Sequence, residues 1–191
     1  MKFGRTTLLM VTACCCAVTA SQAQNVKAST EPTLSTELEA VRANLDRFKD
    51  PIVALSEGYL STHVCTGYAD GGMGVHFINM ATVGPNVDPK VPQVLIYEPQ
   101  GDRLKLVAAE WFVPVAAAKE KPSIFGRPFD GPMDGHEPLM PKQLVHYDLH
   151  VWLWKDNPSG VFNSVNPALK CPDSPNSLVS KENSLAHVHK H

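Results

Sequence analysis

Hydrophobic and polar positions divide the chain after residue 35 into a short helical part and a longer β-rich part. In the first part, apolar residues recur at helical spacing, at Leu38, Val41, Leu45 and Phe48. This spacing predicts an amphipathic helix, which Thr36 can cap. Asp50 followed by Pro51 has the cap-then-proline order that begins a second short helix, and Gly58 is a natural stop. The sequence therefore predicts an N-terminal helical pair.

The β-rich part begins at Tyr59 and consists of short runs of β-branched and aromatic residues separated by Gly and Pro. The runs predicted to be strands are Val75–Met80, Val94–Glu98, Leu104–Val113 and Leu144–Trp154. Pro99–Asp102 separates two of them closely enough for a hairpin. No helical pattern of crossover length lies between the runs, which disfavours a parallel βαβ arrangement. We expect an α+β fold with a mostly antiparallel sheet or sandwich, open or barrel-like, beside the helical pair.

The last of these runs has two different faces when it is read as a strand, because successive side chains point to opposite sides. One face is apolar and consists of Val145, Tyr147, Leu149, Val151 and Leu153. The other carries His146, Asp148, His150, Trp152 and Trp154. Two imidazoles and a carboxylate at alternate positions can bind a transition metal, carry acid–base chemistry, or face water on an outer strand. The two tryptophans suit open water poorly and favour the floor of a cleft.

Two more titratable residues stand in apolar strands. By alternation, Glu110 shares a face with Leu104, Leu106, Ala108 and Phe112. A carboxylate in apolar company must be paired, metal-bound or protonated. His76 is a lone imidazole within an apolar run. Each also has a simpler interpretation: His76 as a core histidine with satisfied hydrogen bonds, and Glu110 as the partner of Arg103 or Arg127.

Taken together, these residues form a candidate metal site. The predicted ligands of one divalent transition metal, which could be Zn, Fe, Cu, Mn or Ni, are His76, Glu110, His146 and His150. Asp148 would orient an imidazole or act as a catalytic acid or base. His136 lies in a long Gly- and Pro-rich connection, residues 119–142. It is either a second catalytic group or extra ligand, or an ordinary exposed loop histidine.

The beginning of the chain has the features of an export signal: Lys2 and Arg5, an apolar run over 7–20, and a small-residue cleavage site ending at Ala23. Cleavage there leaves 168 of the 191 residues, enough for one domain. The expected organisation is a signal peptide (1–23), a flexible lead-in (24–35), a single globular domain (36–172) and a flexible His-containing tail (173–191). The protein would be periplasmic or secreted, with lipid anchoring at Cys14 as an alternative.

Cysteines and charge narrow the function classes. Outside the export segment the cysteines are Cys65 and Cys171, and in an oxidising compartment we expect them to form a disulfide. A two-cysteine metal site is the competing interpretation. Removing the two basic residues of the export segment from 17, while all 19 acidic residues remain, gives a formal charge of −4. No basic stripe for nucleic acid is present, and no later segment has the roughly 20 apolar residues of a transmembrane helix.

Several stretches carry a likeness to a known group. They are Glu57–Tyr59 followed by Cys65, Gly72–Phe77, Val94–Pro99 and His146–Trp154. In these stretches the chain resembles a group of exported bacterial proteins of uncharacterised function. The resemblance implies a single exported domain and implies no activity.

Two functions remain open from the sequence. The first is an exported metal-binding protein that could also be an enzyme, in which an open coordination position activates water or dioxygen on a small organic substrate. The second is an exported binding module without metal. In that case Trp111, Trp152 and Trp154 would form an apolar platform for a sugar, peptide or aromatic ligand, and the histidines would tune its affinity with pH.

Overall fold

A computed structural model describes residue 1 and residues 34–136, 140–173 and 177–180. The expected export signal, Cys14, most of the lead-in and the terminal histidines lie outside the described residues. None of the described helices is long and apolar enough to span a bilayer.

The N-terminal helical pair is confirmed. Helix α1 (Thr36–Leu45) continues into the 3₁₀ turn η1 (Asp46–Lys49), and α2 (Pro51–Ser56) follows. The N-cap of α1 is Ser35 rather than Thr36, because the Ser35 hydroxyl accepts the Leu38 N–H at 3.4 Å. Asp50 caps α2 as expected, with Pro51 in the first helical position. The buried positions of α1 are Leu38, Val41 and Leu45, so the predicted apolar stripe packs inward.

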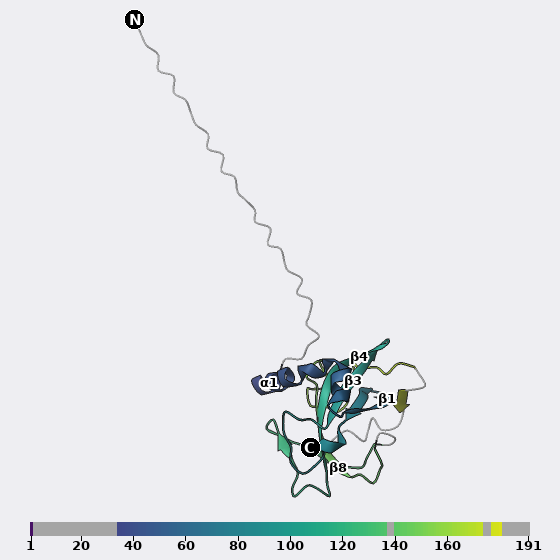
Figure 1. Cartoon of the computed structure of the whole chain (residues 1–191). Coiled ribbons are helices and arrows are strands. Elements are labelled where there is room, and N and C mark those ends of the chain that lie inside the picture. Colours follow the sequence, from purple (N-terminus) through teal and green to yellow (C-terminus); the bar gives the residue numbers. More distant parts are fainter. Residues whose placement is uncertain (2–33, 137–139, 174–176, 181–191) are drawn as a thin grey trace.

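Most of the chain forms one curled antiparallel sheet. Its strands, in spatial order, are β7 (Asp130–Met133), β8 (His146–Val151), β4 (Arg103–Pro114), β3 (Val94–Gln100), β2 (Gly71–Ile78), β1 (Leu60–Tyr68) and β9 (Ser177–Ser180). The first six pair antiparallel, and β9 adds to β1 in parallel. The expected α+β class with an open, barrel-like antiparallel sheet is therefore confirmed (Figure 1). Outside it lie a two-stranded ribbon, β5 (Ser123–Ile124) and β6 (Arg127–Pro128), and the turn η2 (Met80–Thr82).

The four predicted strands correspond to β2, β3, β4 and β8, and the predicted hairpin joins β3 to β4. One strand differs from expectation. β1 was not among the predicted strands, because its polar residues and Gly67 interrupt any apolar alternation. The glycines from Gly71 to Gly74 form the first half of β2, where the pairing with β1 shifts register between Gly72 and Gly74. A Cβ at Gly71 would lie 2.4 Å from the Asn166 carbonyl oxygen. Glycine is therefore required there by close backbone approach.

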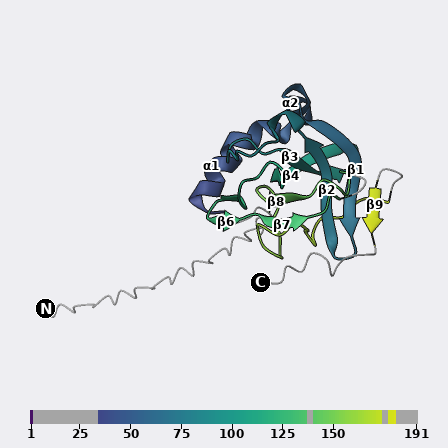
Figure 2. The same cartoon turned by 90° about the horizontal axis from the view of Figure 1, so that it is seen from below.

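The two faces of the sheet are set by a row of apolar residues that crosses four strands. Phe77, Leu95, Ala109 and Val151 lie opposite one another in consecutive ladders. The face of the sheet that carries this row is the one that packs against the helices. Tyr97 lies on this face, where its ring contacts that of Phe77. Its hydroxyl donates to the Phe48 carbonyl of η1 at 2.7 Å. Figure 2 shows α1 and α2 together on one side of the curled sheet. Residues adjacent to the row in sequence point to the opposite face.

A β-bulge in β4 changes which residues share a face. Ile96 pairs with Ala108 but Tyr97 pairs with Leu106, so β4 has one extra residue, Val107, at this point. A single inserted residue reverses the alternation on its far side. Glu110 therefore shares its face with Ala108 and Phe112 only. The expectation that Leu104 and Leu106 lie on the Glu110 face was wrong for this reason.

The C-terminal segment is fastened to the β1–β2 hairpin. Cys65 of β1 and Cys171 form the predicted disulfide, which closes a separation of 106 residues. Asn166 and Gly72 exchange two backbone hydrogen bonds, each 3.0 Å long. Cys65 is thus bonded to sulfur rather than to a metal, and the segment is held at the beginning of the strand that carries His76.

Candidate metal centre

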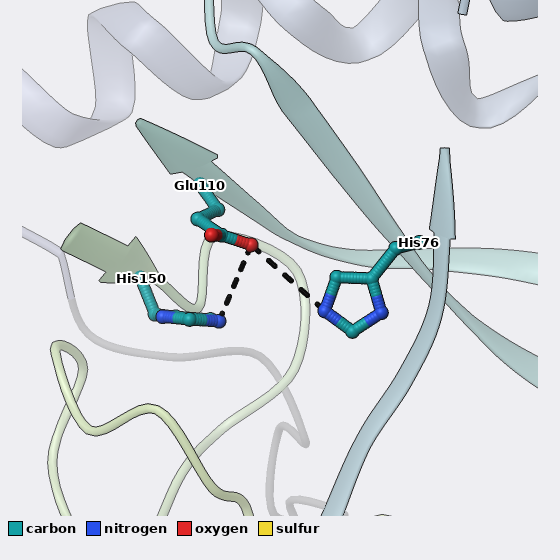
Figure 3. A group of neighbouring side chains, drawn as sticks. All are labelled: His76, Glu110 and His150. Carbon is teal, nitrogen blue, oxygen red and sulfur yellow. Dashed lines mark ion pairs between the residues drawn. The ribbon is translucent and has the colours of Figure 1, made fainter. Parts of the chain in front are cut away.

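Two imidazoles and one carboxylate meet on the sheet face that points away from the helices. His76, Glu110 and His150 belong to β2, β4 and β8 respectively. Each is adjacent in sequence to a member of the apolar row, at Phe77, Ala109 and Val151, so all three point to the same face. We call these three residues the inner triad. Figure 3 shows the Glu110 carboxylate between the two imidazole rings.

The inner triad has distances suited to a metal ion. Glu110 Oε2 lies 3.4 Å from His150 Nε2 and 3.8 Å from His76 Nε2. One possible ligand atom from each residue lies within 4.8 Å of the others. Two ligands bound tetrahedrally at about 2.1 Å from Zn²⁺ are about 3.4 Å apart. The spacing of the inner triad is therefore close to that of ligands around one ion.

The strand order and the register of the sheet explain how the members of the inner triad, far apart in the sequence, come together. Glu110 and His150 lie directly opposite each other in the β4–β8 ladder. β3 separates β2 from β4, so His76 must reach across two strand spacings, about 10 Å. The curl of the sheet toward this face shortens that reach.

A second group lies beside the inner triad. His136, His146 and Asp148 also place one ligand atom each within 4.8 Å of the others. We call them the outer triad. The His136 and His146 rings meet edge to face with centroids 5.4 Å apart, and His146 also contacts the Phe112 ring. Asp148 Oδ2 lies 3.8 Å from both His146 Nε2 and His150 Nδ1, so it is in contact with both triads.

The predicted set of four ligands is thus divided in the structure. His76, Glu110 and His150 come together, but His146 belongs to the outer triad with Asp148 and His136. The reason is the length of a strand: His146 and His150 are four residues apart on β8, roughly 13 Å at 3.3 Å per residue. Two imidazoles at that spacing do not converge on one ion in the way that alternate residues can.

Burial excludes the interpretation of the β8 face as a wet outer surface. His146, Asp148 and His150 are 0%, 2% and 1% exposed. Glu110 and His76 are buried as well, and their ion pairs within the described residues are with each other and with His150, not with an arginine. His76 Nδ1 forms no hydrogen bond of standard geometry among the described residues, although hydrogen bonding to the Gly74 backbone acts to raise the His76 pKa.

The tryptophans do not form the expected ligand platform. β8 ends at Val151, and Trp152 and Trp154 are buried beyond it. The Trp152 indole N–H donates to the Asn163 carbonyl at 2.6 Å, and that of Trp154 donates to Asp46 Oδ1 at 2.7 Å. Trp111 is buried too, and its N–H donates to the Asp88 carbonyl. Buried indoles with their donors already bonded are structural anchors.

Burial and neighbouring charges shift the pKa values of residues in the two triads in different directions. Burial, together with the nearby His150 and His136, lowers the pKa of His76 to about 3. Burial raises the pKa of Glu110 well above its usual value, and the charge of Asp148 adds to this effect. For Asp148, burial acts to raise the pKa, but the neighbouring His146, His150 and His136 outweigh it, so the pKa is lowered. Without a metal, therefore, Glu110 holds its proton to a higher pH than a free glutamate does, whereas Asp148 loses its proton at a lower pH than a free aspartate.

The lowered pKa of His76 gives a testable pH dependence in the metal-free protein. The unfolded chain binds a proton at His76 near pH 6.5, whereas the folded chain does so only near pH 3. In between, the unfolded state holds more protons, so stability is lost as the pH falls. At pH 5, 1.5 units below 6.5, the loss is about 2 kcal/mol. We expect wild type to lose this much more than His76→Gln between pH 7.5 and pH 5, by urea unfolding in EDTA.

The groups that face His76 are Glu110 of β4, Asp148 and His150 of β8, and His136 of the following connection. All of them are kept in the His76→Gln variant, so their own titration largely cancels in the difference. The exposed His63 provides a control, and His63→Asn should follow the wild-type curve. Parallel pH profiles for wild type and His76→Gln would contradict the prediction.

The chain was compared with known proteins. No family model, no curated protein and no solved structure matches it. The sequence indicated every member of both triads. It did not indicate how they divide, and the only signal for the division was the four-residue spacing of His146 and His150.

Proposed function

We propose that the protein is an exported metal-binding protein whose inner triad holds one divalent transition-metal ion. The observation that carries this proposal is the convergence of two imidazoles and one carboxylate, from three strands, at distances that fit ligands of one ion. Imidazole and carboxylate together suit Zn, Fe, Cu, Mn or Ni. The disulfide between Cys65 and Cys171 is compatible with the oxidising compartment that export would provide.

The free-energy cost of burying these polar side chains without an ion supports this proposal. Glu110 is buried with a raised pKa, and a carboxyl group in such a place lowers stability unless it is neutralised or bound. In the same buried region, His76 Nδ1 forms no hydrogen bond of standard geometry with the described residues. A cation among the three side chains would stabilise the carboxylate and accept the lone pairs of the neutral imidazoles.

Two histidines and one carboxylate leave coordination positions that protein groups do not fill. Three-ligand sites of this kind are those in which a metal activates water or dioxygen. The triad is at most 4% exposed, so a reacting molecule would have to be small. We therefore extend the proposal to a metal-dependent reaction on a small organic substrate, with the metal-binding role as its foundation. The alternative of a metal-free binding module loses its support, because the tryptophans that suggested it are buried.

Metal content tests the proposal directly. The protein is exported, purified without an affinity tag, and given His187→Gln, His189→Gln and His191→Gln so that the terminal histidines cannot bind metal. This protein is the reference protein. It is refolded from urea with its disulfide intact and with Zn²⁺, Fe²⁺, Cu²⁺, Mn²⁺ or Ni²⁺ present, because a buried site fills during folding. After dialysis, bound metal is measured by mass spectrometry.

We expect at least one tightly bound ion per chain for one of these metals, and one ion fewer in Glu110→Gln and in His150→Gln. The matched control is Glu98→Gln on the neighbouring strand β3, since Glu98 is buried and paired with Lys155 at 3.1 Å but lies outside both triads. It should bind as many ions as the reference protein. Equal metal content in the reference protein and Glu110→Gln would overturn the proposal.

A further inference from the structure

The outer triad contains a histidine whose ring is oriented by a backbone carbonyl. His146 Nδ1 lies 3.0 Å from the Leu144 carbonyl oxygen. A carbonyl oxygen only accepts, so Nδ1 must carry the proton, and Nε2 of a neutral ring then presents a lone pair. Metal-binding imidazoles typically donate their second nitrogen to a backbone carbonyl in this way, which fixes the ring with the other nitrogen toward the ion.

The Nε2 atom of His146 is buried and forms no hydrogen bond with the described residues. The residue as a whole is 0% exposed. The nearest charged atom is Asp148 Oδ2, at 3.8 Å, which is also an acceptor. Two acceptors facing each other in a buried region require a positive charge between them.

The gap fits a metal ion better than a proton. A proton shared between nitrogen and oxygen would draw the two atoms to about 2.7–2.9 Å. At 3.8 Å the two atoms are instead spaced like ligands on the same ion, each about 2.0–2.2 Å from it. His136 supplies a third ligand atom within 4.8 Å of both.

We propose that His136, His146 and Asp148 bind a second divalent transition-metal ion next to the inner triad. The two sites are neighbours, because His150 presents Nε2 to Glu110 and Nδ1 to Asp148. The outer site does not depend on the inner one: it uses none of the inner ligands, and it would remain if the inner triad bound nothing. His136 is partly exposed, whereas the inner triad is buried throughout, so the outer ion should exchange faster with solvent.

Counting ions in matched variants tests this second site. The reference protein, His136→Gln, Glu110→Gln and the control His63→Asn are refolded with Zn²⁺ and dialysed at the same free Zn²⁺ concentration. We expect two ions in the reference protein and in the control, and one in His136→Gln. His136 lies in a connection and is partly exposed, so its replacement should preserve folding, which near-ultraviolet circular dichroism checks. His146→Gln is measured as well, as a second variant of the same site.

The ion counts show which of the two proposed sites fails, if one does. If Glu110→Gln equals the reference protein while His136→Gln binds one ion fewer, the outer site stands and the inner one fails. If His136→Gln and His146→Gln both equal the reference protein, the outer site is overturned. Electron paramagnetic resonance of the Cu²⁺-loaded protein gives a second measurement. Two adjacent Cu²⁺ ions should broaden each other's signals, and His136→Gln should remove the broadening. Two bound Cu²⁺ ions without it would contradict adjacent sites.

Discussion

Breaking the disulfide between Cys65 and Cys171 is expected to lower the free energy of unfolding by about 4 kcal/mol. The bridge joins residues separated by 106 positions, so its loss frees a very long loop in the unfolded chain. The folded state also loses an anchor, because the bridge holds the C-terminal segment against the hairpin of β1 and β2. Urea unfolding of Cys65→Ala/Cys171→Ala, compared with wild type, measures the effect.

Two controls separate the cross-link from the packing of its sulfur atoms. Cys65 is 2% exposed, so alanine also removes a buried atom. Reducing the wild-type protein keeps both sulfurs and breaks only the bond between them. The same reductant should leave the double variant unchanged. A loss below about 1 kcal/mol in both experiments would show that the loop is restrained by other contacts.

The second large effect concerns Glu110 and reverses sign with metal. In EDTA at pH 8, Glu110→Gln is expected to be more stable than wild type, because the amide replaces a buried carboxyl of the same shape that resists ionisation. The native carboxyl keeps its proton above the usual range while the unfolded one ionises near pH 4.5. Stability of wild type is therefore lost as the pH rises through the raised pKa. Glutamine does not titrate and avoids this loss.

Zn²⁺ should reverse the order of stability, so that wild type becomes more stable than Glu110→Gln. An ion that binds only the folded state, at a free concentration a thousand times its dissociation constant, adds about 4 kcal/mol of stability. Wild type gains this from the inner triad, whereas Glu110→Gln loses the gain of that site. Thermal and urea unfolding in EDTA and in buffered Zn²⁺ measure both proteins. Glu98→Gln, which alters a buried glutamate outside the triads, should show the wild-type response. An unchanged order in Zn²⁺ would contradict the inner site.

Much of the fold could be predicted because local patterns agree with it. The spacing of apolar residues in α1, the cap at Asp50 and the alternation along β8 each depend on neighbours within a few positions. The pairing of strands does not, and neither does the bulge at Val107. One inserted residue there moves Leu104 and Leu106 off the Glu110 face, and no property of β4 alone marks the point where its partner strand shifts.

The candidate site was predictable in its members but not in its grouping. Alternation on β8 places His146, Asp148 and His150 on one face whatever the partners are. Which of them meets Glu110 depends on the register of β4 and β8, which sets Glu110 opposite His150. The sequence also did not indicate that β8 ends at Val151. Beyond it, the buried Trp152 and Trp154 donate to separate partners, the Asn163 carbonyl and the Asp46 carboxylate, so the alternation that suggested a platform no longer applies.

Under the proposed function, the position of β8 in the sheet would make metal binding depend on correct strand pairing. This strand contributes His150 to one triad and both His146 and Asp148 to the other. A slip by a single position against β4 would turn all three toward the helices and present Tyr147, Leu149 and Val151 in their place. A mispaired chain would then have neither triad. Under the proposed function, metal present during folding would therefore bind only the correctly paired molecules.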